Sequence, residues 1–138
     1  MKLSAKIVTI VPLVAVAFLL FAFVPRPWTV LRSLGLAVTL GACAALTIAR
    51  LQLANSFTIL PEANELVTQG IYSRVRNPIY LFSAIAIAGL LLYLNRLDLF
   101  WFFLILIPLQ ILRARKEGAV LEVRFGEAYR QYKARTWF

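Results

Sequence analysis

The stretch LVTQGIYSRVRNPIY, residues Leu66–Tyr80, is polar, basic and rich in turn formers, and it separates the two halves of a strongly apolar chain. Of the 138 residues, 62% are hydrophobic, and the mean hydropathy is +0.81. This composition is typical of a small membrane protein and is implausible for a soluble domain. The stretch therefore marks a place where the chain leaves apolar surroundings.

Four apolar segments, two on each side of this stretch, are candidates for membrane spans. The first pair is long enough to cross roughly 30 Å of hydrocarbon, and the second pair is shorter. The predicted spans are residues 7–24, 33–49, 79–94 and 99–112. A cleaved signal peptide is the alternative for the first span, but Ala22-Phe-Val-Pro-Arg lacks a small-x-small cleavage site. We expect one all-α domain, residues 1–138, built as an integral membrane bundle of about four transmembrane helices.

The basic residues predict how this bundle is oriented, because cytoplasmic loops accumulate Lys and Arg. With four spans, both termini and the middle loop share one side of the membrane. That side holds twelve of the fifteen Lys and Arg residues, against Arg26, Arg32 and Arg96 on the other. We therefore expect a multi-pass protein with both termini in the cytoplasm. The net charge of +9 favours contact with anionic membrane lipid over nucleic acid, because the basic residues cluster at the membrane boundaries.

The composition also excludes several kinds of site. The chain has no histidine and a single cysteine, Cys43, which argues against a zinc site built from the usual ligands and against a histidine-based triad. Cys43 lies within a span, where a buried and inert thiol is expected. A small transporter is disfavoured because the first two spans carry no charged residue.

The second span carries a repeat of small residues every four positions: Ser33, Ala37, Gly41, Ala45 and Ala49. Such a face permits close approach of another helix. Packing within the chain is the favoured interpretation, and a homo-oligomer formed through this face is the alternative.

The segments that flank the last two spans are more polar. Between Leu51 and Gly70, polar residues and Pro61 interrupt any helical period, which predicts a loop or re-entrant segment at the cytoplasmic interface. After the fourth span, apolar residues recur near helical spacing up to residue 132, which predicts an amphipathic helix on the cytoplasmic membrane face. A break is expected after Phe125, because Gly126 weakens a helix.

Two spaced motifs carry the prediction of function. The first is LVxxGxYxxxRNPxY over Leu66–Tyr80, and the second is RxxxExxxLxxxFGxxYxxY over Arg113–Tyr132. Together they resemble the isoprenylcysteine carboxyl methyltransferase family, integral membrane enzymes that use S-adenosylmethionine and are related to phospholipid N-methyltransferases. The resemblance extends over about residues 60–132.

This resemblance implies a cofactor site formed by residues 64–80 and 113–132. Arg113 would position the substrate. The residues implied to bind S-adenosylmethionine are Asn64, Glu65, Leu66, Val67, Tyr72, Asn77, Pro78, Ile79, Tyr80 and Glu117. Without the resemblance, Arg113 and Glu117 would be read as a surface ion pair four residues apart on a helix.

Three positions of the first motif have local structural interpretations as well. Pro78 suits the first turn of a helix and Asn77 suits its cap, so capping and cofactor contact both remain interpretations of Asn77. Gly70 is expected to allow a left-handed turn. The chain departs from the family pattern at Asn77, where a histidine is common, and at Gly118, where a second glutamate often follows.

The resulting hypothesis is a methyltransferase that acts on a lipid-like or isoprenylcysteine-type carboxylate, carried by a small molecule or a protein and entering laterally between helices. An ionised carboxylate needs no general base, so alignment and exclusion of water can carry the reaction. A phospholipid N-methyltransferase acting on ethanolamine headgroups is one alternative. A small, non-catalytic membrane scaffold is the other.

Overall fold

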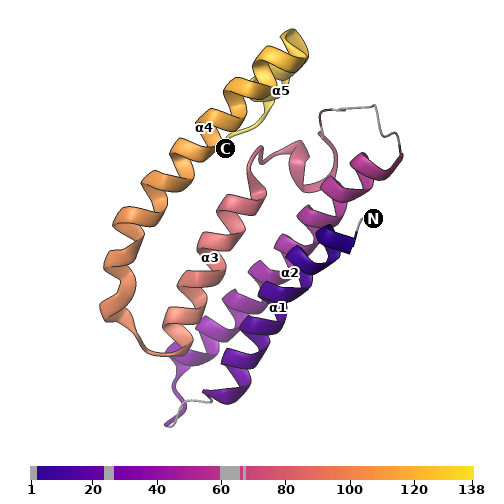
Figure 1. The fold of residues 1–138 in the computed structure, drawn as a ribbon. Helices are drawn as coiled ribbons and strands as arrows, with labels where there is room; N and C mark the ends of the chain where they lie inside the picture. The colour runs from indigo at the N-terminus through magenta and orange to yellow at the C-terminus, as the bar shows by residue number, and fades with distance from the viewer. Residues whose placement is uncertain (1–2, 24–26, 60–65, 67) are drawn as a thin grey trace.

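The computed structural model describes residues 3–23, 27–59, 66 and 68–138. In these residues the chain forms helices and turns without a β-strand, which confirms the all-α class. The elements are α1 (Leu3–Ala22), α2 (Val30–Ile59), the short 3-10 helix η1 (Gly70–Ser73), α3 (Pro78–Tyr93), the 3-10 helix η2 (Leu97–Phe102), α4 (Phe103–Phe125) and α5 (Glu127–Arg135), as Figure 1 shows.

Two stretches are helical, long and apolar enough to cross a membrane, Val30–Leu53 in α2 and Leu97–Phe125 across η2 and α4. Thr9–Ala22 and Pro78–Tyr93 are apolar but shorter. Four transmembrane helices, and the cytoplasmic position of both termini and of α5, therefore stay predictions.

The prediction of a loop from Leu51 onward was wrong for residues 51–59, which continue α2. No glycine or proline interrupts this part of the chain before Pro61. A proline disfavours the helical conformation in the residue before it, so a helix that ends shortly before Pro61 agrees with the sequence. The helix also has a tertiary partner here, because the Gln52 side-chain oxygen accepts a hydrogen bond from the Ile71 N–H at 3.2 Å. Residues 60–65 and 67 lie outside the described part of the chain.

The most extensive contact between helices is that of α2 with α3, and it includes a close approach of the two backbones. A Cβ atom added to Gly35 would lie 2.6 Å from the Gly89 carbonyl oxygen, and one added to Gly89 would lie 2.8 Å from the Thr39 nitrogen. Thr39 is fully buried at this crossing, and its hydroxyl donates to the Gly35 carbonyl at 2.8 Å. The same hydroxyl lies 3.4 Å from the Ala86 carbonyl oxygen of α3. Small side chains and a satisfied hydroxyl thus hold the two helices together.

The predicted packing face of the second span was wrong at Ser33, Ala37 and Gly41, which are exposed, but Ala45 is half-buried and Ala49 is fully buried. Among residues 30–53 of α2, the buried positions are Gly35, Thr39, Ala42 and Ala49. A strict four-residue repeat drifts around the helix by about 40° per step, so it cannot follow one neighbour for long. The buried residues are separated by four, three and seven positions, and this mixed spacing keeps them on one side of the helix. Homo-oligomerisation through the small-residue face of the second span stays a prediction.

The outer helices attach at fewer points. The Tyr93 hydroxyl donates to the Leu20 carbonyl at 2.6 Å and thereby ties α1 to α3. The α4 helix contacts α3 sparsely, and a hydrogen bond of 3.2 Å from the Gln110 amide to the Ser83 hydroxyl links the two. After α4, Gly126 adopts φ +57° and ψ −122°, which confirms the predicted break after Phe125.

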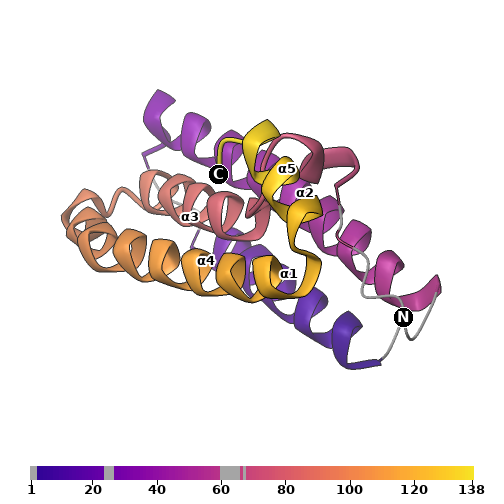
Figure 2. The ribbon, with the colours of Figure 1, turned by 90° about the horizontal axis from the view of Figure 1, so that it is seen from above.

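Because of this break, α5 and the last residues fold back toward η1, as the view from above shows (Figure 2). We call residues 132–138 the C-terminal strap. The buried Tyr132 hydroxyl donates to the Tyr72 carbonyl at 2.8 Å. Burial raises the pKa of Tyr132 to about 12, above the ordinary value of a tyrosine.

Backbone hydrogen bonds extend the attachment of the C-terminal strap to the segment before α3. The Trp137 N–H donates to the Arg74 carbonyl at 3.2 Å, and the Asn77 N–H donates to the Phe138 carbonyl at 2.8 Å. The Arg76 guanidinium donates to the Lys133 carbonyl at 2.8 Å and to the Thr136 carbonyl at 3.1 Å. The two sequence motifs are therefore joined directly in space.

The helix crossing gives a first prediction. Gly35→Ala and Gly89→Ala should each lower the free energy of unfolding by about 1–3 kcal/mol, because the added methyl group meets backbone atoms. Gly41→Ala is the matched control in the same helix, where nothing lies within 4 Å of an added Cβ. It should be neutral or stabilising by up to about 1 kcal/mol. Thermal unfolding in detergent micelles measures the difference, and equal destabilisation by all three variants would contradict the crossing.

A second prediction concerns the C-terminal strap. Tyr132→Phe keeps the ring but leaves the Tyr72 carbonyl without this donor, and it should lower the free energy of unfolding by about 1–3 kcal/mol. Hydrogen exchange at the amides of Asn77 and Trp137 should become faster. Tyr129→Phe is the control, because the Tyr129 ring is also buried but its hydroxyl makes no hydrogen bond within the described residues. A strap that exchanges no faster in Tyr132→Phe than in the control would refute this role.

Candidate functional site

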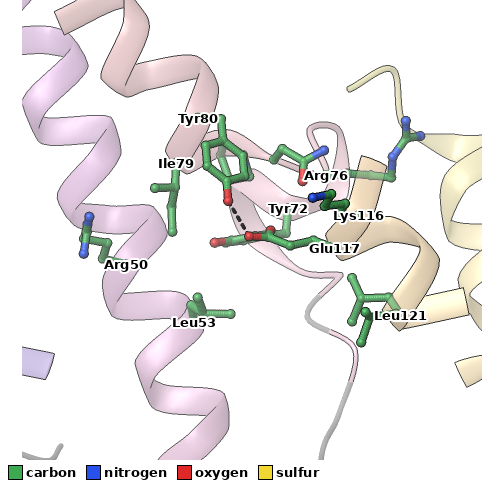
Figure 3. A pocket seen from close by; sticks show the side chains of 12 residues that line it. Arg50, Leu53, Tyr72, Arg76, Ile79, Tyr80, Lys116, Glu117 and Leu121 are labelled. Atoms are coloured by element: carbon green, nitrogen blue, oxygen red, sulfur yellow. Dashed lines mark hydrogen bonds between the residues drawn. The ribbon is translucent and has the colours of Figure 1, made fainter. Parts of the chain in front are cut away.

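A cavity of about 690 Å³ lies where α2, the segment from η1 to α3, and α4 meet. We call it the Glu117 cavity. Its lining residues are Arg50 and Leu53 from α2, Tyr72, Arg76 and Asn77 from the connecting segment, Pro78, Ile79 and Tyr80 from α3, and Lys116, Glu117, Val120 and Leu121 from α4. Figure 3 shows that these side chains come from opposite sides of the cavity.

The structure brings together most of the residues singled out by the two motifs. Six of the ten predicted cofactor-binding residues line the Glu117 cavity: Tyr72, Asn77, Pro78, Ile79, Tyr80 and Glu117. Leu66 is described but does not line it, and Asn64, Glu65 and Val67 lie outside the described residues. Arg113 is exposed, one helical turn before Glu117, and does not line the cavity either.

The Glu117 carboxylate is held by a tyrosine from the neighbouring helix. The Tyr80 hydroxyl on α3 donates a hydrogen bond to it across the cavity (Figure 3). Arg113 and Glu117, both in the described part of α4, form no ion pair, so the reading of these two residues as a surface ion pair was wrong. The carboxylate is thus oriented into the cavity by a contact between helices, and not along the surface of α4.

Tyr72 forms a buried wall of the same cavity. Burial is the main cause that raises the pKa of Tyr72 to about 12, and the charge of Glu117 contributes in the same direction. Gly70 positions this tyrosine, because its φ of +62° makes the left-handed turn predicted for it. The turn begins η1 beside Gln52 of α2, where the Ile71 N–H finds its acceptor.

Asn77 and Pro78 begin α3 as expected. Pro78 occupies the first turn of the helix and Asn77 the cap position, but the Asn77 side chain makes no capping hydrogen bond. The backbone of Asn77 is used instead, through its bond to Phe138 in the C-terminal strap. The Asn77 side-chain amide is therefore not used for capping, and Asn77 lines the Glu117 cavity.

Half of the lining residues were not among the predicted cofactor-binding residues. These are Arg50, Leu53, Arg76, Lys116, Val120 and Leu121, of which Arg76 and Leu121 stand in the two motifs. Helical spacing from Glu117 would have found Val120 and Leu121 on the same face of α4. Arg50 and Leu53 were out of reach because the end of α2 was predicted to be a loop. With Arg76 and Lys116, Arg50 gives the cavity three cations against one carboxylate.

Comparison with known protein families places this geometry in context. The model of the phospholipid methyltransferase family matches residues 26–128 of the 138, which include α2, α3 and α4 in full. The comparisons with curated proteins and with solved structures return no significant match. The family match confirms the resemblance indicated by the two motifs, because this family of membrane methyltransferases is related to the isoprenylcysteine carboxyl methyltransferases. With two helices of membrane-spanning length and six of the predicted cofactor-binding residues around one cavity, the chain belongs to the phospholipid methyltransferase family of membrane enzymes.

Proposed function

We propose that this chain is an S-adenosylmethionine-dependent methyltransferase that holds its cofactor in the Glu117 cavity and methylates a lipid-like acceptor. One observation carries the proposal. Tyr72, Asn77 and Tyr80 from the first motif converge with Glu117 from the second on a single cavity. Residues this far apart in the sequence line one cavity in a chain of methyltransferase ancestry, which supports a shared chemical task.

The cavity fits the proposed cofactor in size and in chemistry. Its volume of about 690 Å³ lies within the range of roughly 300–1,000 Å³ that is usual for ligand sites. Glu117 can accept hydrogen bonds from the ammonium and hydroxyl groups of S-adenosylmethionine, and Arg50 and Lys116 can bind its carboxylate. Ile79 and Leu121 supply apolar surface for the adenine ring of the cofactor. When bound, the cofactor supplies a methyl group on a positively charged sulfur.

The charge of the site favours an acceptor that is already anionic. Arg50, Arg76 and Lys116 outnumber Glu117 among the lining residues, and their field attracts a carboxylate. An ionised carboxylate needs no base, so the residues have only to align it and exclude water. Arg113, exposed on α4 next to this cavity, is proposed to position the acceptor. The sparse contact between α3 and α4 supports lateral entry of a lipid-like molecule.

A second candidate is an ethanolamine-phospholipid N-methyltransferase, and the family match favours it as directly as the first. An ammonium headgroup has to lose a proton before it can accept a methyl group. Glu117 is the carboxylate that lines the cavity and would receive this proton, with Tyr80 holding it in place. The two candidates share the cofactor site and differ in the product.

Cofactor binding tests the proposal directly. Isothermal titration of the purified protein in detergent should show saturable binding of S-adenosylmethionine, and Glu117→Gln should weaken this binding roughly 10- to 100-fold, because a charge-assisted hydrogen bond is lost. Glu127→Gln is the matched control, since Glu127 is an exposed carboxylate on α5 that does not line the Glu117 cavity. A folded wild-type protein that binds no cofactor in detergent or in lipid would favour the non-catalytic scaffold.

The acceptor is identified by whether mild base cleaves the bond between the transferred methyl group and the acceptor. We expect labelled methyl groups to appear in a product that mild base hydrolyses, as a carboxyl methyl ester does. A base-stable label on ethanolamine headgroups would establish the N-methyltransferase instead. Efficient methylation of a purely water-soluble acceptor without detergent or lipid would contradict a lipid-like acceptor of either kind.

A further inference from the structure

A second cavity, of about 570 Å³, adjoins the Glu117 cavity and shares Arg76 and Asn77 with it. We call it the Lys133 cavity. It lies among α4, α5 and the C-terminal strap. Besides the two shared residues, its lining comprises Ile111, Ala114, Arg115, Gly118, Ala119 and Glu122 from α4, Tyr129 and Lys133 from α5, and Phe138. Of the residues that the resemblance assigns to the cofactor, only Asn77 lines this space, and it is shared with the Glu117 cavity.

The charge around the Lys133 cavity is not balanced. Arg76, Arg115 and Lys133 are its cations, and Glu122 is the one carboxylate side chain among its lining residues. Glu122 is already paired with Arg130 at 2.9 Å, so it does not neutralise the cavity. Arg115 and Lys133 form no ion pair with any residue that the structure describes. The side chains that line this half-open cavity therefore carry an excess of positive charge.

One of these cations is held rigidly in place. The Arg76 guanidinium donates to the carbonyls of Lys133 and Thr136 and to the Thr136 hydroxyl at 3.0 Å. These acceptors are uncharged, so they orient the guanidinium without cancelling its charge. A fixed cation costs less conformational entropy when an anion binds, which favours binding.

The rest of the wall is small or apolar. Ala114 and Ala119 line the cavity from α4. Ile111 lines it as well and is the lining residue of α4 nearest to the start of the apolar stretch Leu97–Phe125. Gly118 keeps the space open, because a Cβ there would lie 2.7 Å from the Tyr129 hydroxyl and would displace that ring. Cations set beside apolar surface, at the end of a helix of membrane-spanning length, suit an anionic headgroup attached to an acyl chain.

From this arrangement we infer that the Lys133 cavity binds the phosphate group of an anionic phospholipid, at a site separate from the cofactor. Phosphate oxygens are strong acceptors for Arg and Lys donors. Binding requires no methyl transfer, so the inference stands whether or not the proposed reaction is correct. The shared residues Arg76 and Asn77 place this lipid beside the Glu117 cavity.

Native mass spectrometry of the full chain in detergent, titrated with phosphatidylglycerol, tests the role of charge. Arg115→Gln with Lys133→Gln should weaken binding about tenfold or more, because two charge-assisted contacts are lost. Arg124→Gln with Arg135→Gln is the matched control: it removes the same charge from the same two helices, at exposed positions outside the cavity. Equal losses in both double variants would show diffuse attraction to the surface and overturn the site. Equally tight binding of zwitterionic phosphatidylcholine would also overturn it.

Filling the cavity tests its shape without changing its charge. Ala119→Trp should block phosphatidylglycerol binding, whereas Val123→Trp, on the same helix at a position 91% exposed and outside the lining, should not. Retained binding in Ala119→Trp would refute the cavity as the site. Inorganic phosphate should compete poorly, because it lacks the acyl chains. Displacement of the lipid by inorganic phosphate at similar concentration would identify free phosphate as the ligand and overturn the assignment to a lipid.

Discussion

The close approach of α2 and α3 at Gly35 and Gly89 is the constraint on which the rest of this structure depends. Neither position leaves room for a side chain, and Thr39 satisfies its hydroxyl within the crossing. In a bilayer, where apolar side chains gain little by leaving lipid for another helix, such backbone proximity is a main source of helix association. The crossing fixes the path of α2, whose far end then reaches the start of α3 and supplies Arg50 and Leu53 to the site.

The second organising feature is the return of the chain after Gly126. A helix that continued straight would leave the segment from Tyr72 to Asn77 without hydrogen-bond partners from the C-terminal strap. The turn instead brings α5 back, and side-chain and backbone bonds join the strap to Tyr72, Arg74, Arg76 and Asn77. Two adjoining cavities share Arg76 and Asn77 at this junction, and α5 lines the second. The α4 helix contributes Glu117 to the first cavity and Arg115 to the second.

Much of the local structure could be predicted from single residues. Proline at the first turn of α3, a left-handed Gly70 and a break at Gly126 all follow from the conformational preferences of those residues, and all three are confirmed. The errors arose where contacts with residues far away in the sequence decide the local structure. Residues 51–59 are helical although a loop was predicted, and α2 packs on Gly89 through Gly35 and Thr39, whereas Ser33, Ala37 and Gly41 of the predicted repeat are exposed.

The sequence by itself determined that this is an apolar, helical membrane protein with a polar centre, and the spacing of two motifs was enough to indicate its methyltransferase family. Both conclusions rest on amino-acid composition and on the spacing of residues within short segments, and neither depends on how the helices pack. Only the tertiary structure decided that Glu117 bonds to Tyr80 and not to Arg113, and that Arg50 and Arg76 line the same cavity as Glu117. Tyr80, Arg50 and Arg76 lie far from Glu117 in the sequence, so their geometry depends on how the whole bundle packs.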